Sequence, residues 1–91
     1  MNELLPVGSL ILLKNTSKYI VIFGFLYKKK NKNEIYDYMG YLYPYGTINN
    51  NEKILFNHNE IDKVIFEGYR DEKWNSYKNK LLEVLNDKRK D

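Results

Sequence analysis

Residues 34–46, EIYDYMGYLYPYG, contain five of the nine tyrosines of the chain. Aromatic residues favour a pleated, half-buried surface, so this segment predicts a long β-strand. Pro44 and Gly46 then end the strand in a turn. Successive side chains of a strand point to opposite faces, and both faces of this one are largely apolar or aromatic. We therefore expect it at the centre of a curled sheet, with cover on both sides.

Apolar runs elsewhere in the chain supply the neighbours of this strand. Residues 18–27 are apolar on both faces, and Gly24 among them suits a bulge or a sharp bend. The polar segment 28–33 joins them to the tyrosine-rich strand, so the two predict an antiparallel hairpin. In the last strand we expect Ile61, Val64 and Phe66 to contact the core. The predicted strands are residues 9–13, 18–27, 34–43, 53–56 and 61–67.

Residues 71–87 predict the one helix. Asp71 and Glu72 place negative charge at its N-terminus, where the helix dipole favours it. Large apolar side chains recur at helical spacing and predict the stripe that packs on the sheet. The stripe consists of Trp74, Tyr77, Leu81, Leu82 and Leu85, with Val84 at its flank.

These elements predict one domain, residues 1–91, that is mainly β with one C-terminal α-helix. No helix separates the strands, which excludes a parallel sheet. Two strands that are apolar on both faces favour a small five-stranded antiparallel meander, curled into an SH3-like open barrel. The alternative is an α+β fold, in which a flat antiparallel sheet carries the helix on one face.

Composition limits the classes of protein that this chain can belong to. A chain of 91 residues builds one compact core. It has no cysteine, which excludes disulfides, thiolate metal sites and cysteine nucleophiles. Its longest apolar runs are far shorter than the roughly 20 residues of a membrane span. Because the N-terminus also lacks the features of a signal peptide, we expect a soluble cytoplasmic protein.

The residue types that carry catalysis or bind metals are few. His58 is the only histidine, and its nearest carboxylates in the sequence are Glu60 and Asp62. A metal site usually draws on several histidines or cysteines, so we expect no metal and no cofactor. Flanked by two asparagines in a turn, His58 instead predicts a local hydrogen bond to the backbone.

Four carboxylates come into question for acid/base chemistry, namely Asp37, Glu60, Asp62 and Glu67. Nothing in their spacing predicts that they meet in a cleft. Asp37 lies between two tyrosines on an apolar strand, so it needs either solvent at a sheet edge or a hydroxyl or basic partner. The chain also has no glycine-rich phosphate loop and no nucleophile elbow. We therefore expect a protein that is not an enzyme.

The tyrosines favour protein recognition, since Tyr and Trp are enriched at interfaces. Nine tyrosines exceed what so small a core can bury, and we expect Tyr43 and Tyr45 at the strand end to be exposed. The candidate partner-binding residues are Tyr36, Tyr38, Tyr43, Tyr45 and Tyr69. The alternative is a small barrel that binds single-stranded nucleic acid. Its candidate contacts are the clustered lysines Lys28, Lys29, Lys30 and Lys32, which contribute four positive charges to a net charge of +3.

Six ordered blocks of the sequence carry a family resemblance. They are Leu4-Leu5-Pro6-Val7-Gly8-Ser9, Tyr36-Asp37-Tyr38-Met39-Gly40, Tyr43-Pro44-Tyr45-Gly46, Phe56-Asn57-His58, Ile61-Asp62 and Phe66-Glu67-Gly68-Tyr69. With them the chain resembles, from about Leu4 to Leu85, the uncharacterised bacterial family numbered 4176 among domains of unknown function. The lysine-rich segment 28–32 and the triple asparagine at 49–51 depart from the family pattern.

The resemblance implies a small cytoplasmic protein of Gram-positive bacteria, encoded beside LXG-domain toxins and small helical proteins in type VII secretion loci. By that association the protein is expected to be an adaptor or chaperone that binds the effector or its helical targeting partners. An immunity protein that neutralises the toxin is a further alternative. The family supplies no catalytic or cofactor residue. The sequence leaves the oligomeric state open.

Overall fold

The computed structural model describes residues 3–29, 33–47 and 53–88. Within these ranges the chain forms five β-strands, a single 3₁₀ turn and one α-helix. The strands are β1 (Leu10–Leu13), β2 (Tyr19–Lys28), β3 (Ile35–Leu42), β4 (Ile54–Phe56) and β5 (Ile61–Phe66). The 3₁₀ turn η1 (His58–Glu60) joins β4 to β5, and α1 (Glu72–Lys88) follows the sheet. Each strand and the helix agree with their predicted bounds to within one residue at either end.

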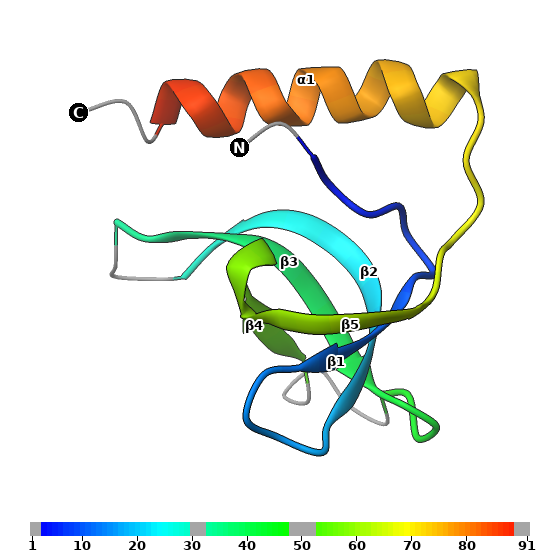
Figure 1. Ribbon diagram of the computed structural model, residues 1–91. Coiled ribbons are helices and arrows are strands. Elements are labelled where there is room, and N and C mark those ends of the chain that lie inside the picture. The colour runs from blue at the N-terminus through cyan, green and yellow to red at the C-terminus, as the bar shows by residue number, and fades with distance from the viewer. Residues whose placement is uncertain (1–2, 30–32, 48–52, 89–91) are drawn as a thin grey trace.

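The strands form one antiparallel sheet in the order β4-β3-β2-β1-β5. The long hairpin of β2 and β3 is confirmed and lies at its centre. The last strand returns to β1 instead of pairing with β4, so β4 and β5 are the two edges. The predicted fold class is therefore confirmed: the protein is mainly β, with a five-stranded antiparallel sheet that is not closed and a single C-terminal helix (Figure 1).

Glycines allow β2 and β3 to approach and bend. The register between them shifts between Ile22 and Gly24, as expected of a bulge at this glycine. Gly40 is buried opposite Ile22, and a Cβ atom there would collide with the side chain of Ile20 and the carbonyl oxygen of Val21. The close contact at Gly40 therefore excludes any larger residue without a backbone shift.

The core lies between the concave side of the sheet and the helix. Its fully buried side chains come from every layer: Leu4 from the N-terminal segment, Ile11, Ile20, Ile22 and Tyr38 from the strands, and Phe56 from β4. Trp74 and Leu81 of α1 join the same cluster. Figure 1 shows α1 lying across one end of the curled sheet, with the N-terminal segment beneath it.

The helix is attached to the sheet through aromatic contacts. The ring of Trp74 lies 5.3 Å from that of Phe25 on β2, and Tyr77 approaches the same ring at 6.3 Å. Trp74, Leu81 and Leu85 are buried as the stripe predicted, whereas Tyr77 is half-exposed at 51%. The apolar stripe through which α1 packs on the sheet is therefore narrower than the sequence predicted. No helix among the described residues is long and apolar enough to cross a membrane.

Candidate protein-binding surface

The predicted partner-binding tyrosines lie in different environments. Tyr43, Tyr45 and Tyr69 are 54%, 75% and 81% exposed, so the predicted exposure of Tyr43 and Tyr45 is confirmed. Tyr36 is only half-buried, and its hydroxyl donates a hydrogen bond to Oε2 of Glu34 at 3.2 Å. That bond and the negative charge of Glu34 raise the pKa of Tyr36.

Tyr38 is the member of the set that cannot contact a partner, because none of its surface is exposed. Its ring stacks on Phe56 with centroids 5.2 Å apart. Its hydroxyl oxygen accepts a hydrogen bond from the backbone N–H of Leu5 at 2.9 Å. Burial raises the pKa of Tyr38 well above its ordinary value. We therefore correct the candidate set: Tyr38 is a core residue that holds the N-terminal segment.

His58 and Asp37 complete a polar network around Tyr38. Nδ1 of His58 lies 2.6 Å from the Tyr38 hydroxyl, so the ring contacts a side chain and not the local backbone as predicted. The backbone N–H of His58 donates to Oδ2 of Asp37 at 2.7 Å. Two environments were predicted for Asp37, solvent at a sheet edge or a hydroxyl or basic partner. Asp37 is buried, so the first of these is wrong. The sequence did not predict a backbone donor for Asp37, because nothing in it placed η1 against β3.

The other candidate carboxylates do not gather around His58 as a catalytic or metal site. Oε2 of Glu60 accepts the backbone N–H of Asn57 at 2.6 Å, which caps η1. Glu67 pairs with Arg70 at 3.3 Å, and Asp62 is exposed on β5. In the described part of the chain, no group of three or more His, Cys, Asp or Glu residues is placed to hold a metal ion.

Of the four lysines considered for nucleic-acid contact, Lys28 and Lys29 are exposed at the end of β2. Lys30 and Lys32 lie outside the described residues. The exposed side chain of Lys53 approaches this end of the hairpin, where its Nζ donates to the Tyr27 hydroxyl at 3.0 Å and lies 4.4 Å from the centre of that ring.

The side of the sheet that faces away from the core carries an apolar row. Ile11 and Ile20 pair with each other and are buried, so their neighbours Leu10 and Val21 point to the opposite side. Residues in register share a face of the sheet. The register therefore places Phe66, Leu10, Val21 and Tyr41 in one row across β5, β1, β2 and β3. We call this side of the sheet the outer face.

Further aromatic side chains extend the row. Phe23 is the extra residue of the β2 bulge, and its ring lies 5.5 Å from that of Tyr41. Tyr19 pairs with Leu12 in the next row, and its carbonyl accepts the N–H of Tyr43 at 2.9 Å. The outer face thus runs from Phe66 on one edge of the sheet to the exposed tyrosines after β3.

The most exposed side chains of the outer face are large. Tyr19, Phe23 and Phe66 are 41%, 41% and 63% exposed. Since a whole aromatic side chain presents about 150–250 Å², these three together expose about 300 Å². Contiguous apolar patches of about 300–600 Å² are the largest on typical monomers and are often functional. The outer face is therefore the best candidate for a binding surface.

The exposure of β5 contradicts the prediction that its apolar residues contact the core. Val64 and Phe66 were expected in the core, but they are 45% and 63% exposed. The register between β1 and β5 shifts between Leu10 and Ile11, which makes Ile65 an extra residue and breaks the alternation of side chains. Because β5 is also a sheet edge, Val64, Ile65 and Phe66 are all exposed.

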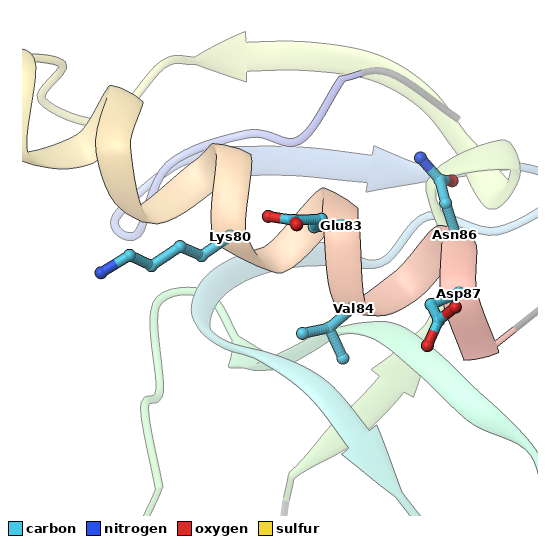
Figure 2. Close-up of a pocket in the computed structure, with 5 residues that line it drawn as sticks. All are labelled: Lys80, Glu83, Val84, Asn86 and Asp87. Carbon is cyan, nitrogen blue, oxygen red and sulfur yellow. The ribbon is translucent and has the colours of Figure 1, made fainter.

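A hollow beside the C-terminal half of α1 is lined by Lys80, Glu83, Val84, Asn86 and Asp87 (Figure 2). All five of these residues are exposed, and four of them are polar or charged. Figure 2 shows their side chains spreading in different directions from the helix and not converging on one point. The hollow is therefore weaker as a candidate ligand site than the outer face is as a binding surface.

A comparison with known protein families identifies one that matches this chain. The model of a domain of unknown function, DUF4176, matches residues 4–76, which is most of the chain. The chain belongs to the DUF4176 family. The match to DUF4176 confirms the resemblance drawn from the ordered sequence blocks, and it includes the exposed strand β5 and the first turn of α1. No curated protein and no solved structure matches the chain.

Proposed function

We propose that this DUF4176 protein is a non-enzymatic protein-binding accessory factor. It acts as an adaptor or chaperone for an LXG effector of type VII secretion and for the effector's small helical targeting partners. The observation that carries the proposal is the amount of large apolar surface that a chain of 91 residues leaves exposed. The choice of an LXG effector comes from the sequence resemblance, whereas the choice of a protein as ligand comes from this surface.

The chemistry of the surface supports a protein ligand. Tyrosine and phenylalanine side chains bury a large area at low entropic cost, and tyrosine keeps its hydroxyl available for hydrogen bonds. The described exposed residues of this kind are Tyr19, Phe23, Tyr43, Tyr45, Phe66, Tyr69 and Tyr77. Most lie on the sheet or at its ends, where a partner can reach several of them together.

Co-expression with the LXG effector and helical proteins encoded beside it tests the proposal. The tagged protein is purified and run on a sizing column at micromolar concentration. We expect the effector or its helical partners to co-elute with it. If the protein elutes alone under these conditions, the adaptor function is wrong.

Two variants make this experiment specific. Tyr43→Ala with Tyr45→Ala removes exposed rings, so it should release the partner while the melting temperature stays the same. A variant with Lys28, Lys29, Lys30 and Lys32 replaced by Ser should keep the partner. Loss of binding to a generic single-stranded oligonucleotide in the lysine variant, without any protein partner, would support the nucleic-acid alternative instead.

A toxicity assay separates an adaptor from an immunity protein. The LXG effector is expressed in a sensitive host with and without this chain. An adaptor should leave growth inhibition unchanged, whereas an immunity protein should restore growth.

A further inference from the structure

The outer face carries large apolar side chains but has no second layer among the described elements. The inner face packs on the N-terminal segment and α1, whereas along the outer row Phe66 is exposed and Leu10, Val21 and Tyr41 are half-buried. Domains are stable when each apolar face of a sheet packs against another layer. Four strands about 4.8 Å apart make this row about 15 Å long. That is the length of about ten residues of an α-helix, so a single helix can cover it.

The charges beside the outer face are mainly positive. Lys63 pairs with Leu12 of the outer face, and Lys18 directly precedes Tyr19. Lys28 pairs with Ile35, six positions along β3 from Tyr41, and therefore lies farther from the row. All three lysines are exposed.

Carboxylates are few on this side of the strands. Asp37 is buried, and one of its oxygens accepts the backbone N–H of His58. Asp62 is exposed next to Lys63, and Glu67, which directly follows Phe66, is exposed and pairs with Arg70 at 3.3 Å. Glu34 directly precedes Ile35, the partner of Lys28 in the register, and accepts the hydroxyl of Tyr36, which belongs to the inner side of β3. Because Arg70 offsets the charge of Glu67, Lys18 and Lys63 leave the surroundings of the row with a positive balance, and charge complementarity favours an acidic ligand.

We infer that the outer face docks an acidic amphipathic helix of a partner protein. The apolar side of that helix packs on Phe23, Tyr41 and Phe66, and its carboxylates face Lys18 and Lys63. This inference rests on the proposed function, because it specifies where the adaptor binds and what chemistry it recognises. A helix with lysine flanks would meet like charges and bind weakly.

Two synthetic helical peptides test the inference directly. Both have the same leucine stripe, but one has glutamate flanks and the other lysine flanks. Their affinity for the full chain is measured by fluorescence anisotropy at low and high salt. We expect the acidic peptide to bind at least tenfold more tightly than the basic one, and this preference should shrink as salt screens the lysines.

Variants of the chain then locate the site. Phe23→Ser with Phe66→Ser should weaken the acidic peptide at least tenfold, and Lys18→Glu with Lys63→Glu should reverse the preference between the peptides. Two matched controls on α1 should change neither affinity: Val84→Ser removes an exposed apolar side chain, and Lys80→Glu reverses a charge. Melting temperatures confirm that each variant is folded.

The outcomes separate this inference from the proposed function. Equal binding of both peptides, no binding of either, or full affinity in the Phe23/Phe66 variant would overturn the acidic-helix site. If that variant still co-elutes with the LXG effector, the adaptor function stands and only the site is wrong. If the acidic peptide binds as expected but the effector never co-elutes, the site stands and the proposed partner is wrong.

Discussion

The hydroxyl oxygen of Tyr38 lies 2.6 Å from Nδ1 of His58 and also accepts the backbone N–H of Leu5 at 2.9 Å. A phenol has one proton to donate. Since Leu5 is a donor, the Tyr38 oxygen keeps its own proton for His58, and Nδ1 accepts it in the tautomer that carries the ring proton on Nε2. One buried hydroxyl thereby links the N-terminal segment, β3 and η1.

Replacing Tyr38 by Phe should destabilise the protein by about 1–3 kcal/mol. The ring can keep its stacking on Phe56, but the N–H of Leu5, a residue only 4% exposed, loses its acceptor. A buried donor left without a partner costs more than the hydrogen bond contributes when it is made. Urea unfolding of the variant and the wild type measures the difference.

Tyr36→Phe is the matched control on the same strand. Its hydroxyl bonds to the exposed carboxylate of Glu34, so its loss should change the free energy of unfolding by less than about 0.5 kcal/mol. If Tyr38→Phe is as mild as this control, the hydroxyl does not anchor the N-terminal segment.

Alkaline pH should destabilise the protein through Tyr38. Burial raises its pKa above the ordinary value of 10.0, so the folded chain keeps a proton that the unfolded chain releases near pH 10. Below pH 10 both states hold the proton and the stabilisation is fully present. As pH rises from 10 toward the raised pKa, the free energy of unfolding should fall by up to about 1.4 kcal/mol per pH unit.

Urea unfolding at several pH values above 9 measures this slope. Tyr38→Phe has no proton to release, so its stability should depend less steeply on pH over the same range. An identical slope in the wild type and in the variant would assign the alkaline instability to other groups.

The strands, their order along the chain and the helix could be predicted because local signals agreed. Each of these signals affects only residues close to it in the sequence. They are the alternation of apolar residues, Gly24 at the bulge and Asp71 at the helix start. The exposure of Tyr43 and Tyr45 followed from Pro44 and Gly46, which end the ladder. These features depend on neighbours in the sequence, which a single chain displays.

The Tyr38 network and the exposure of β5 could not be predicted, because both depend on long-range pairing. His58 reaches Tyr38 only because β4 pairs with β3 and carries η1 there. Val64 and Phe66 have the pattern of core residues, but β5 forms an edge and is bulged. The apolar residues on both faces of strands 18–27 and 34–43 predicted that both faces of the sheet are covered. In the described part of the structure only the inner face is covered, by α1 and the N-terminal segment.

The close approach of β2 and β3 predicts a large difference between two glycine substitutions. A Cβ atom on Gly40 would lie 2.6 Å from the carbonyl oxygen of Val21, which is backbone and cannot turn away. A Cβ atom on Gly24 would meet Cε of Met39 at 2.7 Å, the flexible end of a side chain. Gly40→Ala should therefore cost about 1–3 kcal/mol or more, and Gly24→Ala less than about 1 kcal/mol.

Thermal and urea unfolding of the two glycine variants give the comparison. Both substitutions add one methyl group in neighbouring strands, so differences in strand propensity cancel to a first approximation. A loss at Gly24 equal to that at Gly40 would show that Met39 cannot move and that this part of the sheet is packed as tightly as the core.

Asp71 caps the N-terminus of α1. Its Oδ1 accepts the backbone N–H of Trp74 at 2.9 Å, the geometry of an N-cap, and Trp74 packs on Phe25. Asp71→Ala should lower the stability by about 0.5–2 kcal/mol, because that N–H loses its acceptor. Asp71→Asn supplies an equivalent oxygen without the charge, so it should retain most of the stability. Thermal unfolding followed by circular dichroism compares the two, and equal losses would assign the effect to the charge near the helix dipole and not to the cap.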